Sequence, residues 1–377
     1  MKNILYKSFE KYPKNILIYL LEKYPTKCWN WQNISSNPNL TLELLEKYSN
    51  KLWSFGVCGI SSNENFRIEW IEKYPDKDWH WGLCGISSYQ NLSIEFIEKF
   101  SNKPLYWGSG GISSNPNMVI EWIEKFPNKP WSFGSFGISR NLSIELIEKY
   151  PDKDWHWGCG GISLNPNFKI EWIEKYPNKP WGFGQFGISA NPNLTIEMIE
   201  KYPDKEWSFG RYGISSNSNL TIKMIEKYPD KNWDWQYITK YSSLIIELIE
   251  KYPDKAWHWG KYGISSNPAI TLKILEKYSD KDWWFGQNGI SSNPAITLKI
   301  LEKYSDKEWN WFDISCNPSL TLEIIEKYID KINFNQLSIN KFTYNNKYRK
   351  IYQKIILFYY LSKSNCIYDI RRYCITF

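Results

Sequence analysis

The chain has 377 residues and a formal net charge of +7, with 42% hydrophobic and 23% charged residues. Aromatic residues make up 18%, including 22 Trp, and this richness excludes an intrinsically disordered chain. Seven scattered Cys without a Cys-x-x-Cys pair exclude a disulfide framework and are typical of a reducing compartment.

One unit of 24–26 residues repeats along most of the chain. An Ile followed by Ser or Thr recurs in steps of 26 residues, three times 24, from Ile34 to Ile314. A partial copy begins near Phe9, and a degenerate copy ends at Leu337. Such self-similarity is the signature of a solenoid. We therefore expect about a dozen stacked repeats over residues 1–340.

The first half of each unit has a helical pattern, as in residues 37–48. Asn37 suits an N-cap, and Pro38 suits the first helical position. Leu40, Leu44 and neighbouring apolar residues fall on one broad face, and Glu43 and similar residues fall on the other. In three later copies Lys replaces this Glu, so the sequence predicts an exposed polar ridge that changes sign along the chain.

The second half of each unit allows two interpretations. Most copies end in Trp-x-Trp-Gly-x-x-Gly or a close variant, which can be a short antiparallel helix or an extended segment. In copies that lack the Gly pair, Trp235 and Ile238 have helical i, i+3 spacing. This favours an all-α solenoid of α-hairpins, and the alternative is an α/β horseshoe like that of leucine-rich repeats.

The repeat stops where the basic charge accumulates. Residues 341–377 contain eight Lys or Arg and one Asp, and so carry the whole net charge of +7. Within this basic C-terminal segment, residues 346–362 have apolar positions at helical spacing. We expect a capping helix over the apolar face of the last repeat, because solenoid ends need covering. Nucleic acid is a possible partner through this segment alone.

Recurring polar residues suggest catalytic or metal sites but fit neither well. Paired Glu residues such as Glu43 and Glu46 recur in most copies, whereas a catalytic pair needs one site with two environments. His80, His156 and His258 are three or four repeats apart, too far to share a metal.

Cys58 and Cys84 occupy equivalent slots in adjacent copies, and we expect small buried thiols there. The Gly-rich segments lack the Gly-Lys-Ser/Thr ending of a phosphate-binding loop. The sequence thus predicts no catalytic, cofactor-binding or metal-ligating residue and no cofactor.

The aromatic pairs have two interpretations. They form the core between repeats, or they form an exposed ladder on which sugars or bases stack. The first slot lapses to Leu105 and Ile332, and aliphatic residues are tolerated better in a core than in a ladder. We therefore favour the core.

The unit resembles a known viral repeat. The run from Asn191 to Glu197, Asn-Pro-Asn-Leu-Thr-Ile-Glu, followed by Pro-Asp-Lys-Glu-Trp ending at Trp207, is similar to the tandem Trp-x-Trp/Asn-Pro-Asn repeats of uncharacterised proteins of giant DNA viruses of amoebae. The resemblance covers roughly residues 9–340. It implies a virus-encoded protein in the host cytoplasm or virion, without a known activity.

These features predict a non-enzymatic scaffold for protein–protein interaction with a partner of unknown identity. Variable slots beside a fixed frame tailor the binding surface of a repeat protein. Here they are the residue between the aromatics and the pair inside Gly-x-x-Gly. The alternative is an aromatic-ladder binder of glycan or single-stranded nucleic acid. No apolar stretch reaches the length of a transmembrane segment, and no signal peptide is expected, so we expect an intracellular protein.

Overall fold

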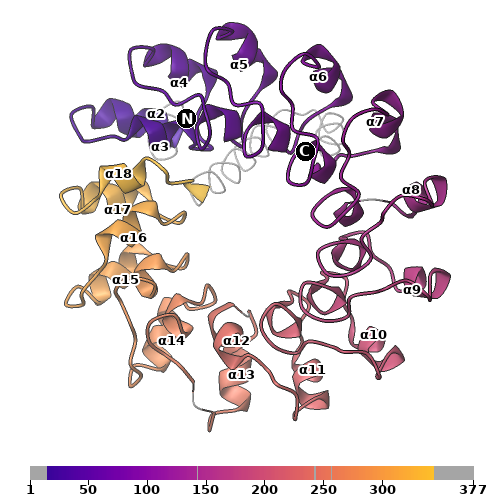
Figure 1. Cartoon of the computed structure of the whole chain (residues 1–377). Helices are drawn as coiled ribbons and strands as arrows, with labels where there is room; N and C mark the ends of the chain where they lie inside the picture. Colours follow the sequence, from indigo (N-terminus) through magenta and orange to yellow (C-terminus); the bar gives the residue numbers. More distant parts are fainter. Residues whose placement is uncertain (1–14, 142, 242, 256, 344–377) are drawn as a thin grey trace, which may run out of the picture.

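The computed structural model describes residues 15–343, except residues 142, 242 and 256. In this part of the chain the structure is all-helical and has no strand, so the predicted α-hairpin solenoid is confirmed and the α/β horseshoe is not supported. Thirteen repeats follow one another around a ring with a central opening (Figure 1). No helix among the described residues is long and apolar enough to cross a membrane.

Each repeat contributes one short α-helix to the outside of the ring. In the described chain these thirteen outer helices are α2 (Ile16–Lys23), α4 (Leu42–Lys47), α5 (Ile68–Lys73), α6 (Ile94–Lys99), α7 (Ile120–Lys125), α8 (Ile144–Lys149), α9 (Glu171–Lys175), α10 (Ile196–Lys201), α11 (Ile222–Lys227), α13 (Ile245–Lys251), α14 (Leu272–Lys277), α15 (Leu298–Lys303) and α17 (Leu322–Lys327).

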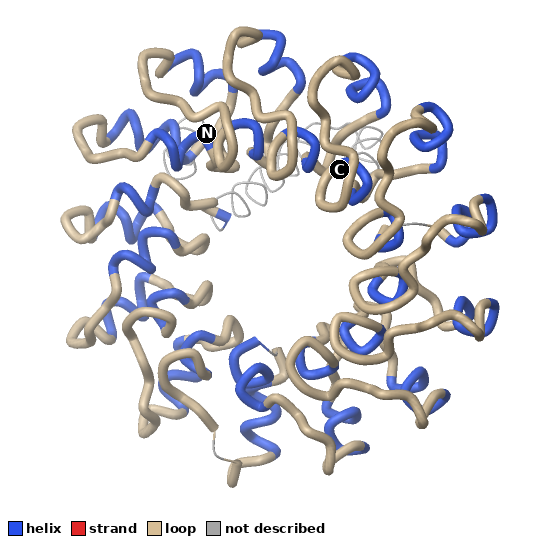
Figure 2. Tube along the Cα trace, viewed as in Figure 1, coloured by secondary structure: helices blue, strands red, loops and turns tan. Residues whose placement is uncertain are grey.

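The second half of each repeat forms an inner segment. Where the Gly pair is absent it is an α-helix: α3 (Trp31–Ser35), α12 (Trp235–Tyr241), α16 (Trp311–Cys316) and α18 (Phe334–Leu337). Where the pair is present it is a loop and one 3-10 turn, namely η1 (Ile60–Ser62), η2 (Ile86–Ser88), η3 (Ile112–Ser114), η4 (Ile138–Arg140), η5 (Ile162–Leu164), η6 (Ile188–Ala190), η7 (Ile214–Ser216), η8 (Ile264–Ser266) and η9 (Ile290–Ser292). Figure 2 shows these inner segments around the opening.

The outer helices begin later than the sequence predicts. Helix α4 starts at Leu42, and the Thr41 side chain accepts a hydrogen bond from the amide of Leu44, so the prediction of Asn37 as N-cap is wrong. Asn37 is buried and binds another repeat instead. Helices of this length are not stable alone, so their stability comes from packing between repeats.

The apolar face predicted for each helix is the core. Leu40, Leu44 and Leu45 are almost completely buried, as is the recurring Ile of the inner segments, such as Ile34. Glu43 is exposed, and so is Lys223 in the equivalent position, which confirms the predicted polar ridge.

A buried Asn joins neighbouring repeats through main-chain groups. The side-chain amide of Asn63 donates to the carbonyls of Ser35 and Asn37 in the preceding repeat, both at 2.9 Å. The hydroxyl of Ser35 in turn accepts from the amide of Ser54 in the next repeat at 2.9 Å. These bonds satisfy main-chain groups that regular secondary structure would otherwise pair.

The aromatic pairs form the core between repeats, as predicted. The Trp155 side chain is 7% exposed, its indole nitrogen donates to the carbonyl of Tyr150, and its ring meets Phe133 of the preceding repeat edge to face at 5.0 Å. Lys153 lies 5.4 Å from the centre of the same Phe133 ring. Equivalent edge-to-face pairs recur around the ring.

Lys–Glu ion pairs form a belt around the outer helices. Each outer helix ends in Glu-Lys, and its Lys pairs with the Glu of the preceding helix, as Lys201 does with Glu174. Thirteen such pairs link the thirteen helices of the described chain in a complete circle, which we call the belt.

The first repeat packs on the last and closes the ring. Asn37 donates to the carbonyls of Ser338 and Asn340 at 2.8 and 3.0 Å, as the buried Asn does at internal junctions. The Trp29 ring meets Phe334 edge to face at 5.0 Å, and Lys23 pairs with Glu326. The closing junction therefore has the same contacts as a covalently continuous one.

Ring closure covers the apolar face of the last repeat. Ile16 and Leu20 of α2 pack in one buried cluster with Ile324, Leu337 and other residues of the final repeats. The predicted capping segment, residues 341–377, lies almost entirely outside the described residues. The face that it was expected to cover is in contact with α2.

Candidate binding surface

The variable residues of the repeat lie in the inner loops. A loop such as residues 156–161 is closed by the amide of Ile162, which donates to the carbonyl of His156 at 2.8 Å. The second glycine of the loop, Gly161, has no room for a side chain, because an added Cβ atom would lie 2.0 Å from that carbonyl oxygen. Equivalent glycines in the other loops have the same restriction. The fixed glycine is thus a steric requirement of the loop.

The residue between the two aromatics supports the loop. The imidazole Nε2 of His156 lies 2.8 Å from the carbonyl oxygen of Cys159, and His80 and His258 make the same contact in their loops. The indole nitrogen of Trp284 likewise donates to the main-chain carbonyl of Gln287 at 2.9 Å. The three His therefore have a local role, and the described residues contain no cluster of His, Cys, Asp or Glu suited to a metal.

The residue before the second glycine has a left-handed backbone in every loop of this kind. Seven of these residues are not glycine: Cys58, Cys84, Phe136, Phe186, Tyr212, Tyr262 and Asn288, with φ between 53° and 64°. Gly110 and Gly160 occupy the slot in the other two described loops, with φ of 80° and 75°. The left-handed conformation costs a residue with a side chain about 1–2 kcal/mol.

This conformation directs main-chain groups along the ring. The amide of Gly160 donates to the carbonyl of Phe186 at 2.8 Å, and the amide of Phe186 donates to the carbonyl of Tyr212 at 2.9 Å. The amide of Phe136 likewise donates to the carbonyl of Gly160 at 3.2 Å. Adjacent loops are thereby joined, and glycine satisfies the geometry without strain.

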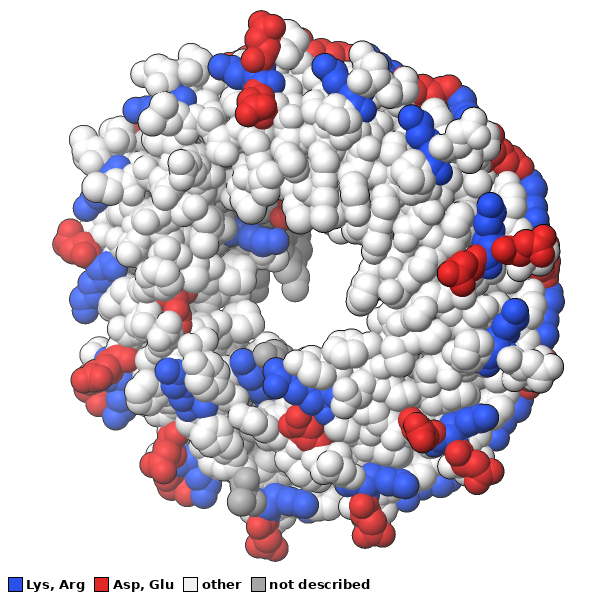
Figure 3. Space-filling view, viewed as in Figure 1, with Lys and Arg blue, Asp and Glu red and all other residues white. Residues whose placement is uncertain are grey.

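Large side chains in these loops are exposed. We define the inner rim as Val57, Leu83, Phe136, Phe186, Tyr212 and Tyr262, whose side chains are 41–53% exposed. Phe186 stacks on Tyr212 with ring centres 4.7 Å apart, and Phe136 lies against Gly160 of the next loop. Figure 3 shows that the surface around the opening is largely uncharged, whereas charged residues gather on the circumference.

Cys58 and Cys84 also lie in this surface. Both thiols are exposed, so the prediction of small buried thiols is wrong. The error arises because the pair inside Gly-x-x-Gly points away from the core, which the flanking Trp and Ile fill. Cys316, in helix α16, is more enclosed, and burial raises the pKa of its thiol.

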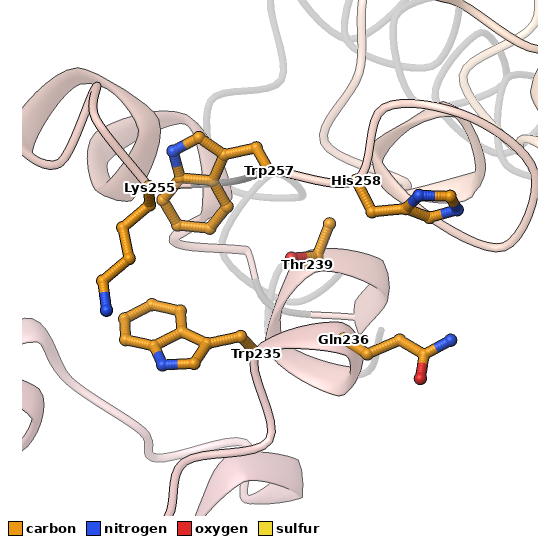
Figure 4. Close-up of a pocket in the computed structure, with 6 residues that line it drawn as sticks. All are labelled: Trp235, Gln236, Thr239, Lys255, Trp257 and His258. Atoms are coloured by element: carbon orange, nitrogen blue, oxygen red, sulfur yellow. The ribbon is translucent and has the colours of Figure 1, made fainter.

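A cavity of about 430 Å³ lies beside α12, between two repeats (Figure 4). Trp235 and Trp257 line it with their rings 5.6 Å apart, and Lys255 covers the Trp235 ring at 4.5 Å. Gln236 and His258 point away from these rings. At other junctions a Lys also lies over the equivalent ring, as Lys179 does over Trp157 and Lys153 over Phe133. The cavity is therefore a wider form of the ordinary junction between repeats.

One sector of the ring next to α12 combines cations with aromatic rings. The Arg211 guanidinium lies 5.0 Å from the centre of the Tyr212 ring. The ammonium groups of Lys240 and Lys261 lie 5.4 and 5.1 Å from the centre of the Tyr262 ring. We call these five residues the basic sector. A cavity of about 180 Å³ is lined by Arg211, Lys240 and Tyr262 of this sector and by Asp234, Gln236 and Tyr237.

No protein-family model, curated protein or solved structure matches the chain. The site is an exposed, mostly apolar surface around an opening, with one basic and aromatic sector.

Proposed function

We propose that the chain is a non-enzymatic, ring-shaped scaffold that binds a protein partner through the inner rim. The observation that supports this most is the placement of Phe136, Phe186, Tyr212 and Tyr262 in left-handed backbone. Glycine occupies the same slot in two loops without strain. Backbone strain that the fold does not require is characteristic of functional sites.

The composition of the inner rim supports a protein partner. Exposed Phe and Tyr are enriched at the centres of protein interfaces, and contiguous apolar surface marks such sites. Val57 and Leu83 extend this surface with aliphatic side chains, which offer nothing for a base or sugar to stack on. The Trp pairs that the alternative glycan or nucleic-acid function would use are packed between repeats, as the edge-to-face contact of Trp181 with Trp157 illustrates.

The proposal is tested by separating binding from stability. Peptides that bind the immobilised full chain are selected from a displayed random library, and their affinities are measured for the double variant Phe136→Gly/Phe186→Gly. Glycine suits the left-handed slot, so the variant should unfold at the same or a higher denaturant concentration. It should lose most of its affinity, about tenfold or more, because aromatic anchors dominate such interfaces.

A matched control is Lys223→Gln, on the polar ridge of α11. This variant should bind the selected peptides as the natural chain does. Undiminished binding by the double glycine variant, or failure of the library to give any binder, would contradict the proposal.

A further inference from the structure

The basic sector differs from the belt in the balance of its charges. In the belt, each Lys has a Glu partner from the preceding helix. Arg211 and Lys261 form no ion pair with any described carboxylate, and Arg211 is exposed while Lys261 is partly exposed. Their cationic groups lie instead within about 5 Å of Tyr rings.

The surroundings of these cations restrict the ligand. The cavity of about 180 Å³ beside them has the volume of a side chain rather than of an extended polymer. Two cations, Arg211 and Lys240, line it together with one carboxylate, that of Asp234, and Lys261 lies beside it over the Tyr262 ring. Asp234 accepts a hydrogen bond from the amide of Tyr237 at 2.8 Å. The sector is thus cationic overall, and it offers aromatic faces beside the charges.

We propose that the basic sector binds an acidic peptide segment of the partner, with its carboxylates on Arg211 and Lys261 and an apolar or aromatic side chain against Tyr212 and Tyr262. This inference rests on the proposed function and specifies the chemistry of the partner. Hydrogen bonds between guanidinium or ammonium groups and carboxylates are the strongest polar contacts available at such a surface.

A peptide fits these observations better than a nucleic acid does. Nucleic-acid binding draws on many cations that follow the phosphate backbone. Here Arg211, Lys240 and Lys261 lie together in one sector, Arg140 lies apart from them beside the Phe136 ring, and Val57 and Leu83 elsewhere on the inner rim are apolar.

The test uses fluorescence anisotropy with the full chain and three labelled probes. These are a short peptide of alternating Glu and Tyr, the same peptide with Gln in place of Glu, and single-stranded oligo(dT). The Glu peptide should bind, and its affinity should fall as NaCl is raised. The variant Arg211→Gln/Lys261→Gln should lose about tenfold or more in affinity for this peptide, because two charge-assisted contacts are removed.

The control Lys223→Gln/Lys273→Gln removes the same charge from the polar ridge and should leave the affinity unchanged. Unfolding transitions of both variants show that they fold. Equal binding of the Glu and Gln peptides, or undiminished binding by Arg211→Gln/Lys261→Gln, would overturn the inference. Tighter binding of oligo(dT), lost in the same variant, would replace the peptide with a nucleic acid.

Failure of this inference and failure of the proposed function give different results. The library-selected peptides report on Phe136 and Phe186, and the Glu peptide reports on Arg211 and Lys261. Suppose that Phe136→Gly/Phe186→Gly loses its affinity for the library-selected peptides, but the natural chain does not bind the Glu peptide. The scaffold function then stands, and the proposal of an acidic partner is wrong.

Discussion

Replacing Asn37 with Ala tests whether the closing junction is as stable as an internal one. The Asn37 side chain is 1% exposed and makes three well-formed hydrogen bonds with main-chain groups. It donates to the carbonyls of Ser338 and Asn340 and accepts from the amide of Asn39 at 2.8 Å. At about 0.5–1.5 kcal/mol for each bond, the loss in free energy of unfolding is about 2–4 kcal/mol.

The matched variant is Asn191→Ala at an internal junction. Asn191 is equally buried, donates to Ser163 and Asn165 at 3.0 and 2.9 Å, and accepts from the amide of Asn193 at 2.8 Å. Urea unfolding followed by Trp fluorescence should give similar losses for both variants. A much smaller loss for Asn37→Ala would refute the reasoning, because in an open solenoid the Asn37 amide would be bonded to water.

Three further predictions concern the loops, the core and the belt. Gly161→Ala should lower the free energy of urea unfolding by about 1–3 kcal/mol, because its Cβ would clash with the His156 carbonyl. In the control Gly158→Ala the added Cβ has ordinary contacts at 3.7 Å, so the free energy of unfolding should change little. Trp155→Ala should cost about 3–5 kcal/mol, and a negligible loss would show that the ring is not core. Hydrogen bonds to Glu raise the pKa of belt lysines such as Lys149, so their contribution to stability is complete below the ordinary value of 10.5 and is lost as pH rises through the raised pKa. The melting temperature should therefore fall at alkaline pH, and a rise in the melting temperature would contradict the predicted direction.

Local features of the fold could be predicted from the sequence because they depend on one repeat and its neighbour. The period, the buried face with Leu44 and Leu45, and the aromatic core around Trp155 follow from spacing and residue type. The start of helix α4 could not be predicted in this way. Asn37 is a good N-cap in isolation, but its amide makes hydrogen bonds with another repeat, and Thr41 caps the helix.

Ring closure could not be predicted, because it depends on the small rotation between successive repeats. Each junction has to turn the chain by one thirteenth of a circle for Trp29 to reach Phe334. Nothing in the pattern of a single unit specifies this angle, although the same junction residues are present in the first and last copies.

The candidate surface was partly predictable. The sequence indicates that the pair inside Gly-x-x-Gly is variable, and this pair lies in the loops around the opening (Figure 2). The pattern of the unit does not by itself predict the left-handed conformation of Phe136 and Phe186. A signal was present, since Gly110 and Gly160 occupy the same slot, and glycine there indicates a positive φ.

Zero-length cross-linking of the natural chain tests ring closure most directly. A carbodiimide joins a Lys amine to a carboxylate in contact with it, so belt pairs such as Lys201–Glu174 are internal standards. In the monomer, peptide mass spectrometry should detect the Lys23–Glu326 cross-link in similar yield. Mixed isotope-labelled and unlabelled chains should give no hybrid cross-link. Absence of Lys23–Glu326 while the internal belt pairs are joined would show that the ring is open.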